Sequence, residues 1–191
     1  MEDTKTILEG TKTETKYGKT HLIYGKGKGK TSSSVGMAAR AAGNGLKVKY
    51  VQFMKGKGTG ESKFLEKMEN VDYFCQENSS LVDIEEGMNK KQVGYLRRYI
   101  EEIRDVEEEY DMLIADEILN VPLFTQKNDD FKLTYKDIER IIENKRSDLE
   151  MVLTGLFCND SLMEKADYIS EIKNVKHPYE QGLEARKGIE F

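Results

Sequence analysis

The chain has 191 residues, enough for one domain with a complete hydrophobic core, and 34% of them are charged. Its net charge of −5 argues against general nucleic-acid binding, which needs a basic face, and no apolar run is long enough to span a membrane. Cys75 and Cys158 have no metal-ligand spacing with His21 or His177. We expect buried, reduced thiols and a cytoplasmic protein.

Short apolar runs alternate with helical patterns along the chain. Residues 1–19 are mostly Thr, Lys and Glu, which predicts a mobile arm ahead of a single domain over residues 20–191. Strands are expected at residues 20–24, 47–53, 71–75, 112–115, 151–154 and 168–173. Helices are expected at residues 31–42, 62–69, 89–109 and 134–144. This alternation predicts an α/β fold, a mostly parallel sheet with helices on both faces.

Two helix starts carry a capping-box pattern, in which a hydroxyl residue is followed three positions later by an acid. They are Thr134 with Asp137, and Ser161 with Glu164 before a further short helix. Residues 76–87 are polar and irregular and follow a strand, which favours a lid or binding loop there.

The most informative segment joins the first expected strand to the first expected helix. Glycines let a backbone curl around a phosphate, and the N-terminus of the following helix adds free donors and partial positive charge. Lys30 is placed to reach terminal phosphates and the Thr31 hydroxyl to ligate Mg²⁺. The alternative is a lysine-rich loop that binds nothing. As a P-loop, the segment predicts these nucleotide-binding residues: Gly25, Lys26, Gly27, Lys28, Gly29, Lys30, Thr31 and Ser32.

An apolar strand that ends in acids has the form of a Walker B element. The strand expected at residues 112–115 is followed directly by Asp116 and Glu117. Because ligands of parallel sheets bind at the carboxyl ends of the strands, we expect these acids to face the P-loop and to hold Mg²⁺. The alternative is a solvated pair of acids. Lys55 and Lys57 add positive charge after the second expected strand, which suits a nucleoside triphosphate.

In combination, these motifs resemble the P-loop ATP:corrinoid (cobalamin) adenosyltransferase family over nearly all of residues 19–191. The resemblance rests on several segments in order: residues 25–31, 36–41, 51–56, 111–117, 154–155, 176–179, 182 and 188–191. It implies a RecA-like fold, a homodimer, and an alkyl-transferring enzyme of cobalamin biosynthesis. The implied reaction moves the 5′-deoxyadenosyl group of ATP to the cobalt of a reduced corrinoid and releases triphosphate.

The resemblance also assigns roles by position. Lys28, Lys30 and Glu117 are the implied catalytic residues, and Thr31 and Glu117 the implied Mg²⁺ ligands, with Asp116 as an alternate or supporting ligand. Cobalamin or a precursor corrinoid would be the second substrate, and an electron donor such as a flavodoxin a further partner. An ordinary P-loop ATPase or kinase, or a non-catalytic nucleotide-binding protein, is the alternative.

One segment departs from the family. Its Gly-Phe-Thr-Trp stretch, which helps to displace the lower cobalt ligand, falls here on residues 79–82, and the chain has no Trp. Residues 76–87 are still the expected corrinoid-side lid, with Leu81 and Val82 as apolar contacts. We therefore expect efficient use of Co(I) and poor use of Co(II). His177 either contacts a phosphate or caps a turn, and Arg40 and Arg186 either contact phosphates or form surface ion pairs.

Overall fold

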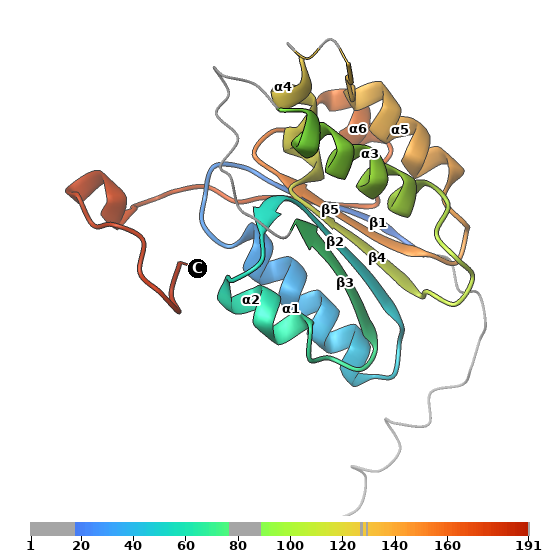
Figure 1. The fold of residues 1–191 in the computed structure, drawn as a ribbon, viewed down its shortest axis with the longest axis horizontal. Helices are drawn as coiled ribbons and strands as arrows, with labels where there is room; N and C mark the ends of the chain where they lie inside the picture. Colours follow the sequence, from blue (N-terminus) through green and yellow to red (C-terminus); the bar gives the residue numbers. More distant parts are fainter. Residues whose placement is uncertain (1–17, 77–88, 127, 129, 191) are drawn as a thin grey trace, which may run out of the picture.

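The computed structural model describes residues 18–76, 89–126, 128 and 130–190. Within this part, six parallel strands form one sheet in the order β3-β2-β4-β5-β1-β6 (Figure 1). The strands are β1 (Thr20–Tyr24), β2 (Val48–Gly56), β3 (Val71–Gln76), β4 (Met112–Asp116), β5 (Glu150–Gly155) and β6 (Tyr168–Glu171). The predicted parallel α/β fold is confirmed, and it is consistent with a RecA-like domain.

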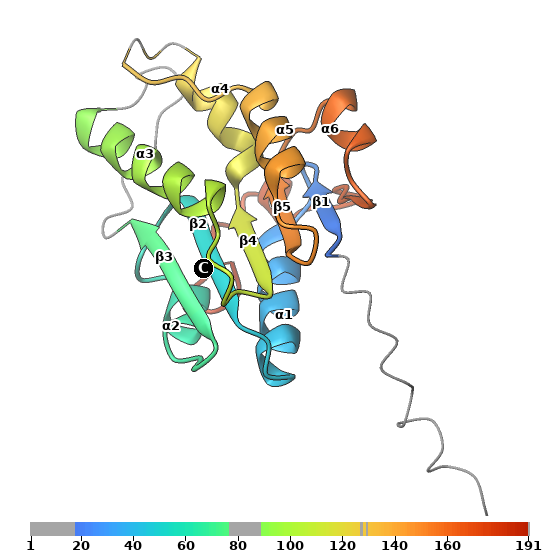
Figure 2. The same ribbon diagram turned by 90° about the vertical axis from the view of Figure 1, so that its right-hand side faces the viewer.

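Helices cover both faces of the sheet, as Figures 1 and 2 show, with α1 and α2 on one face and α3, α5 and α6 on the other. They are α1 (Lys30–Gly43), α2 (Gly60–Leu65), α3 (Lys90–Arg104), α4 (Val121–Thr125), α5 (Tyr135–Asn144) and α6 (Asp160–Glu164), with short 3₁₀ helices η1 (Ile118–Asn120) and η2 (Pro178–Gln181). Neither η1 nor α4 was predicted. None of the described helices is long and apolar enough to cross a bilayer.

Two hydrophobic clusters lie on the two faces of the sheet, because successive strand side chains point to opposite sides. Leu22 and Leu113 join the cluster under α3 and α5, whereas their neighbours Ile23 and Ile114 join the cluster under α1. All five residues of β4 are buried, as expected for a strand covered on both faces. The sheet is therefore a rigid support for the side chains at its carboxyl edge.

The helix expected over residues 89–109 stops short, as α3. The cause is Arg146, whose guanidinium donates to the backbone carbonyl oxygens of Val106, Glu107 and Tyr110 at 3.1, 2.6 and 2.8 Å. These carbonyls follow the helix, and the long-range contact holds them in the chain reversal that leads into β4. Other corrections are smaller: β2 runs further than predicted, β6 ends earlier, and α2 begins and ends before its expected bounds.

One of the two capping predictions is confirmed and the other is wrong. Thr134 and Asp137 form the expected capping box at the start of α5. At α6 the cap is Asn159, whose side chain accepts from the backbone N–H of Leu162 at 3.1 Å, and Ser161 lies inside the helix. Asparagine caps as well as serine, so the pattern fitted two registers.

The N-terminal arm expected over residues 1–19 lies almost wholly outside the described residues, and so do residues 77–87 of the expected lid. Gln76 belongs to β3. After β6 the chain leaves the sheet and curls through η2, so that its end lies beside the loop that follows β1 (Figure 1). We call residues 173–190 the tail.

Candidate functional site

The loop after β1, residues 25–29, connects the sheet to α1 as predicted. Gly25 has a φ of 115°, and a β-carbon there would lie 2.4 Å from the backbone oxygen of Ile172. Only glycine allows this conformation and this approach together. The first N–H groups of a helix have no intrahelical acceptor, and in α1 they belong to Lys30, Thr31 and Ser32. The loop thus opens onto a helix N-terminus with free donors.

The three lysines of the loop have three different partners. Lys30 is buried, and its ammonium donates to the backbone oxygen of Gly27 at 2.9 Å. Lys28 donates to the backbone oxygen of Ile189 at 3.2 Å and forms a 2.9 Å ion pair with Glu190. Lys26 lies over the ring of Phe157.

The buried position of Lys30 affects the protonation of its ammonium. Burial lowers the pKa of Lys30, against the opposing attraction of Glu117 and Asp116. The ammonium is therefore incompletely neutralised by the protein, and an anionic group that entered the loop would stabilise its charged form.

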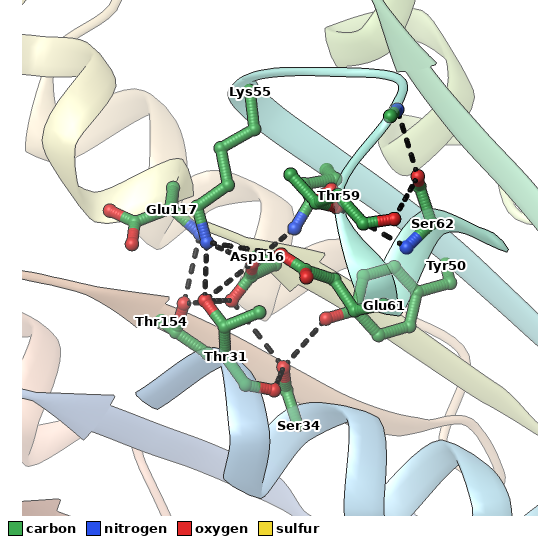
Figure 3. Close-up of polar contacts among 12 residues, drawn as sticks. Thr31, Ser34, Tyr50, Lys55, Thr59, Glu61, Ser62, Asp116, Glu117 and Thr154 are labelled. Carbon is green, nitrogen blue, oxygen red and sulfur yellow. Dashed lines mark hydrogen bonds and ion pairs between the residues drawn. The ribbon is translucent and has the colours of Figure 1, made fainter. Parts of the chain in front are cut away.

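Asp116, at the end of β4, is the best-connected acid of the site. Its side chain is fully buried, and its two oxygens accept hydrogen bonds from Thr154 at 2.7 Å, from Thr31 at 3.0 Å and from Gln52 at 3.0 Å (Figure 3). The amide oxygen of Gln52 in turn accepts from the Tyr73 hydroxyl at 2.5 Å. Several donors on one carboxylate fix its position.

The backbone of Glu117 is in the left-handed region, with a φ of 66°. Its N–H donates to the Thr154 hydroxyl at 2.9 Å, and its carboxylate accepts from the Asn120 amide. Burial, and then the nearby charge of Asp116, raise the pKa of the Glu117 carboxyl. The two adjacent acids therefore have different environments, and Asp116 is the one that contacts Thr31.

A cavity of about 440 Å³ lies beside these groups and is lined by residues of the loop, the start of α1, Lys55, Glu61, Glu117 and the end of the tail. The donors around it suit a hard divalent cation, because they are the hydroxyl oxygen of Thr31 and carboxylate oxygens of neighbouring acids. The Lys55 ammonium already stands at this point, 2.6 Å from the Thr31 hydroxyl oxygen. The residues present therefore fit a divalent cation that Thr31 and a neighbouring acid would hold.

Sequence reasoning did not single out Gln52, Ser34 and Asn120. Gln52 and Asn120 each interrupt an apolar run, which is the signal that was available, whereas Ser34 stands in a run of serines that gave no such signal. Ser34 lies one helical turn after Thr31, is fully buried, and hydrogen-bonds Tyr50 at 2.7 Å. Asn120 joins Glu117 to the backbone N–H of Leu156.

The remaining candidates have structural partners. His177 caps η2 by accepting from the Tyr179 N–H at 3.2 Å, and Arg186 pairs with Glu190 at 3.1 Å, so the turn-cap and ion-pair readings hold for these two. Cys75 is buried and Cys158 half-buried, and both are free thiols. Among the described residues, no cluster of three or more His, Cys, Asp or Glu side chains could hold a metal ion.

Comparison with known proteins extends the picture to the whole chain. Residues 16–191 match the family described as ATP:corrinoid adenosyltransferase BtuR/CobO/CobP. A corrinoid adenosyltransferase of Pseudomonas aeruginosa is 31% identical over 172 residues, which cover 87% of this chain and 80% of that protein.

Two further relatives carry the same description. The corrinoid adenosyltransferase of a Sinorhizobium species is 31% identical over 195 residues, 96% of this chain and 85% of that protein. That of Escherichia coli K12 is 28% identical over 173 residues, 89% of this chain and 84% of that protein. With the family match spanning the entire described fold, the chain belongs to the ATP:corrinoid adenosyltransferase family.

Proposed function

We propose that the protein transfers the 5′-deoxyadenosyl group of ATP to the cobalt of a reduced corrinoid and releases triphosphate. The observation that supports this most is the cavity at the carboxyl edge, where the glycine–lysine loop and a buried acid meet within a chain of this family. In the step, an electron pair of Co(I) forms the cobalt–C5′ bond. The C5′–oxygen bond breaks, and the triphosphate leaves with its electron pair.

The protein needs no general base in this reaction, because the cobalt is itself the nucleophile. Its tasks are to hold C5′ in line with cobalt and to stabilise a leaving group on which negative charge grows. We assign the second task to Lys30, Lys28 and the backbone N–H groups of residues 25–32. In support, the Lys30 ammonium lies inside the loop and Lys28 borders the cavity.

We further assign Mg²⁺ to Thr31 and Glu117, with Asp116 as the group that orients the Thr31 hydroxyl. Both proposed ligands border the cavity. Asp116 accepts a hydrogen bond from the Thr31 hydroxyl, which leaves the lone pairs of that oxygen for other contacts. When bound, Mg²⁺ neutralises part of the charge of the leaving triphosphate.

Two parts of the proposal come from the family resemblance: a homodimer, and an electron donor such as a flavodoxin. Exposed apolar side chains on the tail favour a partner surface there, since Val175 is 98% exposed, Tyr179 73% and Ile189 57%.

The test is incubation of the protein with ATP, Mg²⁺ and a chemically reduced corrinoid. We expect the spectrum of the adenosylated product together with one equivalent of triphosphate, and neither without corrinoid. Release of ADP and phosphate at the same rate with and without corrinoid would instead identify an ordinary ATPase. A parallel incubation with Co(II) and a mild reductant tests the expectation of poor Co(II) use.

A further inference from the structure

Lys55 reaches the site through a break in the regular geometry of β2. The preceding residue, Met54, has a φ of 61°, in the left-handed region that a long side chain rarely adopts. The pairing of β2 with β3 shifts register between Val51 and Gly56, across the same residues. A strand that ran on regularly would not turn here, so the irregularity aims Lys55 back at the cavity.

The ammonium of Lys55 contacts the Thr31 hydroxyl, one of the two proposed metal ligands, and lies near two carboxylates (Figure 3). Its Nζ atom is 2.6 Å from Thr31 Oγ1, 3.6 Å from Asp116 Oδ2 and 3.9 Å from Glu61 Oε1. The Lys55 side chain is only 30% exposed. This is the environment of a bound cation: one hydroxyl and two carboxylates around a single positive charge.

The hydroxyl of Thr31 cannot serve Lys55 and a metal in the same way at once. It has one proton, which it donates to Asp116, and its oxygen accepts from Lys55. A divalent cation on that oxygen would also stand next to a positive ammonium, and such charges repel strongly in a partly buried site. Lys55 and the metal therefore exclude each other.

We propose that Lys55 holds the metal position on Thr31 in the nucleotide-free protein, so that a divalent cation enters only together with the triphosphate. As the triphosphate arrives, Lys55 moves onto it, so that the triphosphate takes over from Asp116 as its partner and the position on Thr31 becomes free for the cation. This inference rests on the proposed triphosphate site but not on transfer to cobalt. It makes Lys55 a substrate-binding residue that also enforces the order in which metal and nucleotide bind.

Lys57 offers a matched control two residues along the chain. It is 52% exposed and forms a 3.5 Å ion pair with Glu66. It does not line the cavity. A change of Lys57 to Met removes the same charge as a change of Lys55 to Met but leaves the Thr31 hydroxyl untouched.

The first test measures Mn²⁺ binding to the nucleotide-free protein. Electron paramagnetic resonance detects the Mn²⁺ that remains free. We expect Lys55→Met to bind Mn²⁺ at least tenfold more tightly than the parent, and Lys57→Met to bind it as the parent does. Thermal unfolding of each variant confirms that it is folded. Equal Mn²⁺ affinity in the parent and in Lys55→Met would overturn the proposal.

The second test is ATP binding by calorimetry, with Mg²⁺ and with chelator, and without corrinoid. If Lys55 moves onto the triphosphate, Lys55→Met should lose at least fivefold more ATP affinity than Lys57→Met in the absence of metal. Equal metal-free affinities would exclude that movement. Neither measurement depends on product formation, so both remain informative if the incubation with corrinoid shows ADP instead of triphosphate.

Discussion

The two walls of the cavity are built differently. On one side Thr31 lines the cavity, and the fully buried Asp116 and Thr154 support it from behind through short hydrogen bonds between strands and a helix. The opposite wall is formed by the tail, where Glu190 is held to Lys28 and Arg186 at the surface. We call them the buried wall and the tail wall.

This difference separates two kinds of contribution to function. Hydrogen bonds in a water-poor interior are strong, and they hold their groups in place before a ligand arrives. Surface ion pairs contribute little and are screened by salt. We therefore expect the buried wall to set turnover and stability together, and the tail wall to adjust nucleotide affinity only slightly.

Asp116→Asn should show the largest effect, because Asp116 accepts the hydrogen bonds that hold the buried wall together. An amide has one acceptor oxygen, so a donor among Thr31, Thr154 and Gln52 loses its partner, which costs about 1–3 kcal/mol of the free energy of unfolding. We expect kcat/KM to fall by about 10²–10³-fold, as for the loss of a charged group at a reacting centre. Urea unfolding and steady-state kinetics measure the two effects.

Glu171→Gln is the control for Asp116→Asn. It removes a carboxylate from the exposed edge strand, where the partner is Lys173 at 2.8 Å. The free energy of unfolding should change by less than about 0.5 kcal/mol, and kcat/KM should not change. If the two variants behaved alike, the buried wall would have no special role.

Lys30→Ala is expected to act on nucleotide binding. Removal of a charge-assisted contact to phosphate costs about 1.5–3 kcal/mol, or about 10- to 150-fold in the dissociation constant of ATP. Calorimetry with MgATP measures it, and Lys63→Ala, on the exposed side of α2, controls for the change of net charge. Unchanged affinity in Lys30→Ala would show that the loop assignment is wrong.

Glu117→Gln should lower turnover by about tenfold or more while changing ATP affinity less. The lost charge matters most in the transition state, where charge grows on the leaving triphosphate. A titration with Mg²⁺ at saturating ATP distinguishes this transition-state effect from weaker metal binding. If Glu117→Gln and the parent had the same kcat at every Mg²⁺ concentration, Glu117 would have no role in the mechanism.

The same variant should be more stable than the parent at neutral pH. The folded-state pKa of Glu117 is raised above 4.5, so its charged form disfavours folding. The parent should lose stability as the pH rises from about 4.5 through the raised pKa, and Glu117→Gln should not show this loss. Melting temperatures of both proteins across that pH range test whether stability falls as the pH rises in the parent and not in Glu117→Gln.

Most strands and the glycine–lysine loop between β1 and α1 were predictable because they depend on local patterns. The strand Thr20–Tyr24 and the helix after it follow directly from an apolar run and a glycine-rich turn. The end of α3 was not predictable, because it depends on Arg146, which lies about forty residues further along the chain. Local patterns cannot report a contact of this range.

The sequence predicted at which edge of the sheet the site lies, but not which side chains contact one another within it. Parallel topology places Thr31 and the two acids at one end of the sheet. Which acid contacts Thr31 depends on the left-handed backbone at Glu117, and the position of Lys55 depends on that at Met54. Positive φ in residues other than glycine leaves no mark in the sequence, so these two turns appear only in the structure.

Glu190→Gln should have the smallest effect, since it changes only the tail wall. It removes a negative charge next to Lys28, so Lys28 becomes freer to contact the triphosphate, and ATP affinity should rise by about two- to threefold. The difference should shrink at high salt. Glu184→Gln, an exposed change of equal charge on the same tail, is the control.

The pH dependence of this effect has a defined sign. Hydrogen bonds from Arg186, and then from Lys28, lower the pKa of Glu190 to about 2. Its ionic contacts are therefore complete above the ordinary carboxyl pKa of 4.5 and are lost only as the pH falls through about 2. The ratio of ATP affinities between Glu190→Gln and the parent should be constant from about pH 6 to 9. A ratio that changed over this range would mean that another group controls the tail wall.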